Sequence, residues 1–411
     1  MLDIKFIRQN PDKVKEGIKN KGANPGIIDE ILELDEKRRE YIKSTENLKA
    51  EQKKLGKDNI EEAKKKKVEL MGIAPSLQGV EKKYTKLMLQ LPNLPLDDVP
   101  IGKDENSNVV VKTVGKKPQF SFKPKDYLKI AEHFDLIDIP RAAKISGTRF
   151  GFIKKEAALL EFALINFAFD NLAKEGFTPI IPPVMIKSEM AQGMGYLEQT
   201  DDEDAYFLPK DNLYLIGTSE QSIGSMHANE VFQEKELPKR YIGFSTCFRR
   251  EAGSYGKDTK GIMRVHQFDK VEMFSFCHPK ESAKEHEFLL SMEEKLMKGL
   301  KIPYQILKMC TGDLGTPAAS KYDIEAWIPS ENRYRETHSA SNCTDFQARR
   351  LNIRYRDSKT NKLEFVHTLN GTAIPIPRPL IAILENYQKK DGSIEMPKSL
   401  QKYLSFKHIK R

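Results

Sequence analysis

A helical repeat that is interrupted once constrains the first quarter of this chain most strongly. Between residues 27 and 91, seam residues recur at alternating spacings of three and four in two runs: Ile31, Leu34, Arg38, Tyr41, Thr45, Leu48, Gln52 and Leu55, then Leu70, Ile73, Leu77, Val80, Tyr84, Leu87 and Leu91. This spacing places the residues on one helix face, as in coiled coils. The segment GKDN at 56–59 separates the runs, and Pro92 ends the second. The pattern therefore predicts two long helices folded back on each other as an antiparallel arm.

Three residues within the second run disfavour a straight helix. Gly72, Pro75 and Gly79 lie between Leu70 and Val80. Proline inside a helix removes a backbone donor and crowds the preceding turn. We therefore expect the second helix to be kinked or broken there.

The chain is too long for a single hydrophobic core. It has 411 residues, and residues 92–115 form a proline-rich linker that ends with a short strand at Val109–Val111. We expect two domains: residues 1–108, which carry the arm at about 27–91, and residues 109–411.

Composition excludes several classes of protein. The four cysteines are far apart, without a CxxC pair or a histidine at zinc-ligand spacing, so neither disulfides nor zinc are expected. No signal peptide or membrane-spanning apolar run is present, so we expect a cytoplasmic protein with no membrane partner. The net charge of +9 suits a polyanionic partner, although lysine-rich solvated surfaces are its commoner cause.

Residues 244–274, FSTCFRREAGSYGKDTKGIMRVHQFDKVEMF, have the pattern of two strands joined by a glycine- and lysine-rich turn. The first strand leads to Arg249 and Glu251, and the second carries Phe268 and Glu272 on one face, because they are four residues apart. A guanidinium can bind phosphate, and a carboxylate can accept from an exocyclic amine. The hairpin therefore suits nucleotide binding and, equally, a salt-bridged surface.

This hairpin resembles motif 2 of the class II aminoacyl-tRNA synthetases, in detail that of bacterial-type seryl-tRNA synthetases. Further segments resemble blocks of that family in its order and spacing: MLDIKFIRQNPDKVKEGI at the N-terminus, LPNLPLDDVPIGKDENSNVVV, TSEQ from Thr218, RETHSASNCTDFQARR from Arg335 and LNGTAIPIPRPLIAILENYQ from Leu369. The likeness covers nearly the whole chain. It implies an α+β fold, in which a coiled-coil arm precedes a class II catalytic domain with a mainly antiparallel sheet flanked by helices.

The resemblance also implies an activity. A serine–tRNA ligase uses ATP to convert L-serine to seryl-adenylate and transfers the seryl group to tRNA(Ser), with tRNA(Sec) as an additional acceptor left open. Arg249 would hold the α-phosphate, Glu251 the adenine amino group, and Phe268 and Arg378 would sandwich the ring. The implied ATP contacts are Arg249, Arg250, Glu251, Val265, Phe268, Glu336, Thr337, His338, Ser339 and Arg378, of which Arg249, Glu336 and Arg378 are the implied catalytic residues.

The implied serine pocket is polar and small. Its residues are Thr218, Ser219, Glu220, Glu272, Asn370 and Thr372. Thr372 stands where the family usually has serine, so its methyl group should tighten the pocket. Alanine would leave buried polar groups unpaired and be rejected strongly. Threonine would be excluded by bulk and contact geometry.

Glu336 and Ser339 match a family pair that ligates a divalent ion, and hard oxygen donors suit Mg²⁺. The segment RETHS departs from the family at Thr337 and His338, where relatives usually show an apolar residue and a serine. We expect His338 to lie beside the nucleotide rather than to bind metal or act as a base. The carboxylate of serine is already the nucleophile, so no protein base is required.

The segment before Arg378 departs most from the family pattern. Relatives usually have a small, glycine-containing strand, whereas this chain has Pro375, Pro377 and Pro379. In a strand, Pro375 and Pro377 remove two donors from one side, so we expect a sheet edge or a bulge there. Pro379 suits the first turn of the following helix, and the adenine contact of Arg378 is expected to remain.

In the resembled family the arm grips the long variable arm of tRNA(Ser) by shape rather than base sequence. Candidate phosphate contacts near the tip are Lys53, Lys54, Lys57, Lys64, Lys65, Lys66 and Lys67. The interspersed Glu61, Glu62 and Glu69 also suit an ordinary solvated helix face. A helix around Glu156–Lys174 leads into FTPIIPPVM, which resembles motif 1, the homodimer interface built around a proline, here Pro182 or Pro183.

Two other classes of protein remain as alternatives. A ligase that loads an amino acid onto a carrier protein would resemble the catalytic domain but would lack a full tRNA-binding arm. A catalytically silent RNA-binding paralogue would have no reason to retain Arg249, Glu251, Glu272, Glu336 and Arg378. Both alternatives therefore fit the sequence less well than a serine–tRNA ligase.

Overall fold

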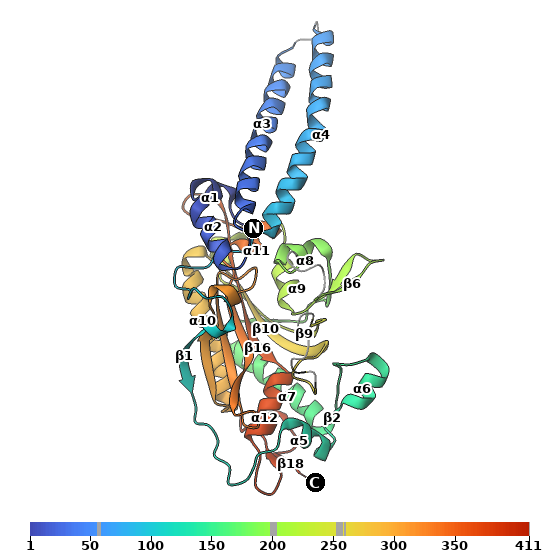
Figure 1. Cartoon of the computed structure of the whole chain (residues 1–411), viewed down its shortest axis with the longest axis vertical. Coiled ribbons are helices and arrows are strands. Elements are labelled where there is room, and N and C mark those ends of the chain that lie inside the picture. Colours follow the sequence, from blue (N-terminus) through green and yellow to red (C-terminus); the bar gives the residue numbers. More distant parts are fainter. Residues whose placement is uncertain (56–58, 198–203, 252–257, 259, 411) are drawn as a thin grey trace. The chain divides into compact units, whose positions relative to one another are not determined.

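The computed structural model describes residues 1–55, 59–197, 204–251, 258 and 260–410. The chain divides into two compact units, Met1–Leu94 and Pro95–Arg411. Figure 1 shows the long helical hairpin of the first unit and the sheet of the second. The domain boundary expected between residues 108 and 109 stays a prediction.

Two short helices precede the arm, α1 (Ile4–Gln9) and α2 (Pro11–Asn20). They are tied to it by the carboxylate of Asp35, which is fully buried. Arg8 donates to this carboxylate at 2.7 and 2.8 Å, and Arg39 donates to it at 3.1 Å. Because a buried charge is costly unless it is paired, this cluster fixes α1 against the base of the arm.

The arm consists of α3 (Ile27–Lys54) and α4 (Ile60–Gln90), which pack against each other. Every seam residue expected in the two runs is buried or half-buried, whereas most intervening positions are exposed. The prediction of an antiparallel helical hairpin is confirmed at the level of individual positions.

Of the kink or break expected in the second helix, the break is wrong, and the kink stays a prediction. Helix α4 continues through Pro75 without interruption. Both Pro75 and Met71, whose carbonyl loses its helical donor, are exposed. Water can therefore satisfy that carbonyl, and packing of Ile73 and Leu77 along the seam holds the helix on both sides of the proline.

An eight-stranded sheet forms the core of the second unit, in the order β1-β11-β12-β13-β16-β10-β9-β4. All its neighbouring strands are antiparallel except β4 and β9. The strands are β1 (Val109–Val114), β4 (Thr178–Ile180), β9 (Lys239–Phe248), β10 (Gln267–Cys277), β11 (Tyr304–Lys308), β12 (Ser320–Ile328), β13 (Arg333–Asn342) and β16 (His367–Pro375). The predicted mainly antiparallel sheet is confirmed.

Three helices cover one face of this sheet: α7 (Lys155–Leu172), α10 (Ser282–Leu300) and α12 (Pro377–Asn386). Val271 and Met273 of β10 belong to the same hydrophobic core as Leu160 of α7 and Leu289 of α10. Because side chains alternate along a strand, the residues between them face the other way. That opposite face carries the candidate site.

Shorter elements surround the sheet. A small sheet of β5 (Met185–Lys187), β7 (Leu213–Leu215) and β6 (Tyr206–Leu208) lies close in sequence to α8 (Ser188–Met194) and α9 (Glu220–Ser225). A second small sheet contains β8 (Val231–Gln233), β14 (Arg354–Arg356) and β15 (Leu363–Phe365), next to α11 (Phe346–Leu351). Peripheral elements are α5 (Tyr127–Phe134), β2 (Ile137–Asp138), α6 (Ile139–Ser146), β3 (Phe152–Ile153), β17 (Ile394–Glu395) and β18 (His408–Ile409).

The proline-rich segment combines a bulge with an early helix start. Val271 pairs with Ile374 but Glu272 pairs with Thr372, so one residue of β16 bulges between them. Pro375 ends the strand, and Pro377 occupies the first turn of α12. The expectation that Pro377 belongs to the strand is wrong, because the chain has already turned into a helix, where a proline at the first position costs nothing.

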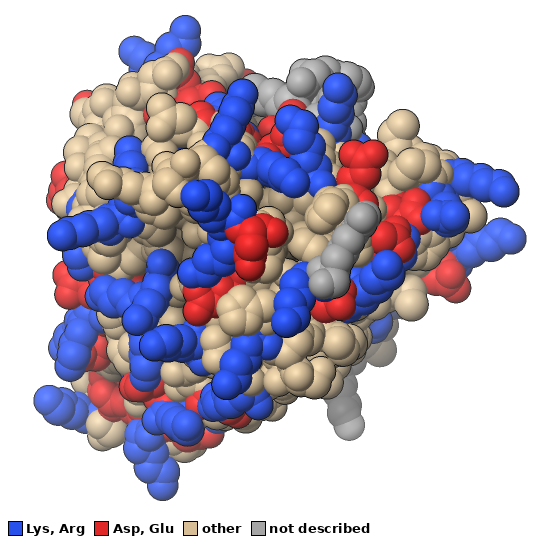
Figure 2. Space-filling model, turned by 90° about the horizontal axis from the view of Figure 1, so that it is seen from below, with Lys and Arg blue, Asp and Glu red and all other residues tan. Residues whose placement is uncertain are grey.

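Charged side chains are spread over the face of the molecule in Figure 2, with Asp and Glu among the Lys and Arg. This distribution is that of a solvated surface, and we assign no polyanion site to that face.

Candidate active site

The expected site residues converge on a cavity of about 480 Å³ in the second unit. It lies within the size range of small-molecule sites. Thirteen of the residues expected from the sequence line it: Thr218, Glu220, Arg249, Glu251, Val265, Phe268, Glu272, Glu336, Thr337, Ser339, Asn370, Thr372 and Arg378.

Arg249 lies at the end of β9, where the hairpin delivers it into the cavity. Its Nε donates to the carbonyl of Gly217 at 3.1 Å, and its guanidinium carbon lies 5.4 Å from the centre of the Phe268 ring. This anchoring limits the rotamers of a long side chain and leaves the terminal nitrogens available for an anion.

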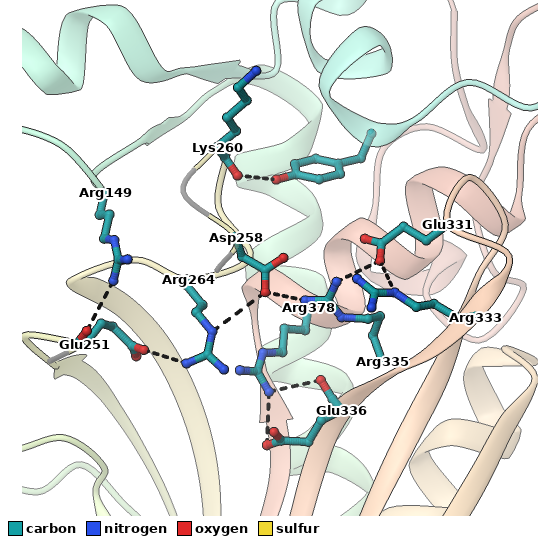
Figure 3. A network of polar contacts seen from close by, with 11 residues as sticks. Arg149, Glu251, Asp258, Lys260, Arg264, Glu331, Arg333, Arg335, Glu336 and Arg378 are labelled. Carbon is teal, nitrogen blue, oxygen red and sulfur yellow. Dashed lines mark hydrogen bonds and ion pairs between the residues drawn. The ribbon is translucent and has the colours of Figure 1, made fainter. Parts of the chain in front are cut away.

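The Glu251 carboxylate is held by Arg264, which lies shortly before β10 in the chain. Its Oε2 accepts from Nη1 of Arg264 at 2.8 Å, and Arg149 contacts its backbone carbonyl. Figure 3 shows the carboxylate of Asp258 between Arg264 and Arg335, and it forms an ion pair with each of them.

Glu336 and Arg378, which both line the cavity, form an ion pair (Figure 3). Nη1 of Arg378 lies 3.0 Å from both the carboxylate and the backbone carbonyl of Glu336. Burial raises the pKa of the Glu336 carboxyl, but Arg378 and Lys321 outweigh it and bring the pKa to about 2. The carboxylate is therefore ionised, and 48% of the side chain remains open to the cavity.

The other end of the cavity is deeply buried and carries opposed charges. Nζ of Lys270 lies 2.5 Å from Oε2 of Glu272 and donates to Oγ1 of Thr218 at 3.3 Å. Burial raises the pKa of the Glu272 carboxyl to about 7, although Lys270 opposes this effect. Glu220 is also buried, and its carboxylate accepts from Gln347 at 3.3 Å.

Strand register explains why residues far apart in sequence meet here. Glu272 of β10 is paired with Thr372 of β16, and Phe274 is paired with Asn370. Thr372 and Asn370 are two residues apart and both line the cavity, as period-two alternation requires. On β13, a register shift makes Thr337 an extra residue, which lets the consecutive Glu336 and Thr337 both reach the cavity.

Three of the described candidates for binding serine or ATP do not line the cavity. Ser219 is fully buried and donates to the carbonyl of Gly243 at 3.3 Å. Arg250 is exposed, and its guanidinium carbon lies 5.2 Å from the centre of the Tyr206 ring. His338 is fully buried, and burial lowers its pKa to about 3. The structure therefore does not place His338 in the cavity wall, where we expected it beside the nucleotide.

Sequence reasoning missed several cavity residues, including Lys270, Lys321, Arg264 and Tyr196. Lys270 had a readable signal, because it lies two residues before Glu272 and so shares its strand face. Tyr196 had none, because it follows an irregular turn after α8.

The candidate lysines of the arm belong to α3 and α4 or to the segment between them, and none of the described ones lines this cavity. Lys53, Lys54, Lys64, Lys65 and Lys67 are exposed, and Lys57 lies outside the described residues. Lys66 instead forms an interhelical ion pair with Glu51 at 2.5 Å.

Two family models match the chain. "Seryl-tRNA synthetase N-terminal domain" matches residues 1–95, and "tRNA synthetase class II core domain (G, H, P, S and T)" matches residues 206–387. The serine–tRNA ligase of Cutibacterium acnes is 46% identical over 418 residues, covering 98% of both chains. The chain belongs to the seryl-tRNA synthetase family. The serine–tRNA ligase of Dictyoglomus turgidum is another relative, 44% identical over 100% of this chain and 99% of its own.

Solved structures of the seryl-tRNA synthetase family have the same fold. Seryl-tRNA synthetase from Pyrococcus horikoshii, complexed with ATP, superposes with a TM-score of 0.92 at 41% identity, over 100% of this chain and 99% of the other. The cytoplasmic serine–tRNA ligase of Naegleria fowleri, in complex with AMP, gives 0.90 at 34% identity with the same coverage. Within the described part of this family member, no helix has the length and apolar character to cross a membrane.

Proposed function

We propose that this chain is a serine–tRNA ligase, which activates L-serine with ATP to seryl-adenylate and transfers the seryl group to tRNA(Ser). One observation carries the proposal. A single cavity joins an ionised pair, Glu336 and Arg378, to a buried polar end that contains Glu272, Thr218 and Thr372. The relatives named as serine–tRNA ligases support the same reaction.

In the first step, the carboxylate of serine attacks the α-phosphorus of ATP and pyrophosphate leaves. Arg249 would bind the α-phosphate and stabilise its developing charge, while Phe268 and Arg378 would hold the adenine ring between them. Preorganised charge and orientation account for the rate, and no general base is needed.

Glu336 and Ser339 fit a Mg²⁺ ion. The Glu336 carboxylate is ionised and faces the cavity. The Ser339 hydroxyl donates its hydrogen to Asp323 at 2.6 Å, which leaves its lone pairs for a hard cation. A divalent ion held by these two oxygens would neutralise phosphate charge.

At the amino acid end, Glu272 and Glu220 would bind the serine ammonium, and Thr372 with Asn370 would bind the hydroxyl. Alanine would leave these buried groups unpaired and be discriminated against strongly. Threonine would be excluded by its additional methyl group, since Thr372 already adds one to the pocket.

We further propose that the arm binds tRNA through its exposed lysines, that the enzyme is a homodimer, and that it works in the cytoplasm. Exposed apolar side chains near motif 1 support the dimer: Leu159 and Phe162 share one face of α7, and Ile181 follows β4.

The test is ATP–pyrophosphate exchange with serine, threonine, alanine or glycine and no tRNA. Exchange with serine alone is the expected result. Arg249→Ala should abolish it, and Arg356→Ala, an exposed arginine of β14, should not. Exchange with none of the amino acids, in a protein that still binds tRNA, would establish a silent paralogue instead. Exchange followed by transfer to a carrier protein but not to tRNA would establish a carrier-loading ligase.

A further inference from the structure

A fully buried glutamate lies on the face of the sheet opposite the candidate active site. Glu293 belongs to α10 and is buried among the apolar residues that this helix packs against the sheet, such as Leu289 and Leu296. Neither of its carboxyl oxygens has a hydrogen-bond partner in the described part of the chain. A leucine would fill such a position without burying a polar group, which is unfavourable when the group is unpaired. Stability alone therefore does not account for this glutamate.

Glu293 contacts β16 where that strand carries the proposed serine pocket. A Cβ atom on Gly371 would lie 3.3 Å from Oε1 of Glu293 and 3.5 Å from Cβ of Leu289. The absence of a side chain at Gly371 thus leaves room for the carboxyl group against the strand. Asn370 and Thr372, on either side of Gly371, line the cavity. Because side chains alternate along a strand, Glu293 and the serine pocket lie on opposite faces of these three residues.

The backbone of Thr372 is held less completely than the preceding part of β16. The ladder between β13 and β16 ends with the pair Ala340 and Gly371. The ladder between β10 and β16 is interrupted directly after Thr372 by the bulge, because Val271 pairs with Ile374. Bulges redirect side chains and disrupt the ladder locally. The direction of the Thr372 side chain therefore depends on contacts from outside the sheet.

The protonation state of Glu293 suits such a contact. Burial raises the pKa of its carboxyl group well above the ordinary value, and the Glu272 carboxylate adds to this effect, whereas the backbone N–H of Thr372 opposes it. The group is therefore neutral. A neutral carboxyl group offers one donor and one acceptor, as a peptide group does, and can take the place of the ladder that ends here.

We propose that Glu293 is a positioning residue for serine: it holds the bulged part of β16 from behind, so that the Thr372 side chain points into the serine pocket. This inference rests on the proposed function. Glu293 touches no substrate and acts only through the strand. Its replacement should therefore affect serine binding and the exclusion of threonine. ATP binding should be spared, because Arg249 and Arg378, two of its proposed ligands, lie outside β16.

Two substitutions separate the polar head of Glu293 from its bulk. Glu293→Gln keeps a donor and an acceptor in the same place, whereas Glu293→Leu fills the space with an apolar side chain. Leu300→Ala removes a fully buried side chain further along α10 and is the matched control for lost packing. In serine-dependent pyrophosphate exchange, Glu293→Leu should raise the KM for serine about tenfold and change the KM for ATP by less than about twofold. Glu293→Gln and Leu300→Ala should keep both KM values within about threefold of wild type.

Discrimination between amino acids is a second readout. The ratio of kcat/KM for serine to that for threonine should fall about tenfold in Glu293→Leu, but not in Glu293→Gln or Leu300→Ala. Gly371→Ala places a methyl group 3.3 Å from Oε1 of Glu293, so it should displace the strand and lower the same ratio. This variant tests the contact independently, even if Glu293→Leu does not fold.

Three results would overturn the positioning role. They are an unchanged KM for serine in Glu293→Leu, equal increases in the KM values for serine and ATP, and a Glu293→Gln variant that behaves like Glu293→Leu. An unchanged ratio in Gly371→Ala would overturn it as well. Absence of exchange in the wild type would instead remove the proposed function, and the positioning role with it.

Discussion

Lys270 and Glu272 lie on the same face of β10, with Nζ of the lysine 2.5 Å from Oε2 of the glutamate. Both side chains are almost fully buried. Burial favours the neutral carboxyl and raises its pKa to about 7, while the lysine ammonium favours the carboxylate. The charge available to bind a serine ammonium therefore depends on Lys270.

This dependence predicts a pH profile. Below pH 7 most Glu272 is protonated, so kcat/KM for serine in pyrophosphate exchange should rise with pH through about 7 and then level off. In Lys270→Met the ammonium group that lowers the pKa of Glu272 is lost. The midpoint of the pH profile should therefore move to higher pH, and the KM for serine at pH 7 should rise about tenfold. Lys270→Arg retains the charge and should stay near the wild-type midpoint. The same midpoint in Lys270→Met would refute the coupling.

Arg378→Ala should weaken ATP binding. The substitution removes the guanidinium that we propose stacks on adenine and frees the Glu336 carboxylate that it pairs with at 3.0 Å. Such contacts contribute about 1–2 kcal/mol, so the KM for ATP should rise about tenfold while the KM for serine changes little. Arg378→Lys keeps the charge but not the planar guanidinium, so its KM for ATP should lie between those of the wild type and Arg378→Ala. An unchanged KM for ATP in Arg378→Ala would show that this side chain, at the start of α12, does not contact ATP.

Regular elements were predictable from the sequence because their periodicity is local. The seam of the arm and the shared face of Phe268 and Glu272 follow from spacing alone. The same alternation explains why the His338 side chain faces away from the cavity, because the adjacent Ser339 side chain faces into it. Thr337 also lines the cavity, because of a register shift in β13 that has no local sequence signal.

Contacts between distant segments were not predictable from spacing. Asp258 pairs with Arg335, which lies 77 positions later in the chain at the start of β13, and no local period relates the two residues. Ser219 lies between two cavity residues on an irregular turn, where no period states which side chains point inward. The family resemblance implied most of the site residues, and the structure shows which of them line the cavity.

The exposed arm lysines should bind RNA phosphates, whereas Lys66 should contribute little. Lys66 pairs with Glu51 at 2.5 Å, and its side chain is 20% exposed. Replacing Lys64, Lys65 and Lys67 together with Ala should raise the KM for tRNA and lower its salt dependence by about one log–log unit per lost phosphate contact. Lys66→Ala should change this KM by less than about twofold. Aminoacylation at several KCl concentrations measures the KM for tRNA and its salt dependence. Pyrophosphate exchange without tRNA is the control and should be the same in the wild type and both variants.

His338 should affect acid stability rather than catalysis. Burial lowers its pKa from 6.5 to about 3, so between these pH values the unfolded chain binds a proton that the folded chain does not. Stability should therefore fall as pH decreases through this window, by up to about 1.4 kcal/mol per pH unit for this group. His338→Gln cannot titrate and should show a shallower slope in urea unfolding between pH 6 and 4. Its pyrophosphate exchange should remain within about tenfold of wild type, and an unaltered slope would contradict the assignment.

Phe162→Glu should convert the proposed homodimer to a monomer. Phe162 is 64% exposed on α7, three residues from Leu159, and Ile181 beyond the edge strand β4 is 81% exposed. Leu159 and Phe162 share one face of α7, and an exposed apolar face supports an interface there. A glutamate buried in that interface would lack a partner. Light scattering should give twice the chain mass of 47.1 kDa for the wild type and the chain mass for the variant. Ile145→Glu on α6 removes an equally exposed apolar side chain outside this surface and should remain dimeric. A monomeric wild type would exclude the dimer. A dimeric Phe162→Glu would show that the interface does not include this face of α7.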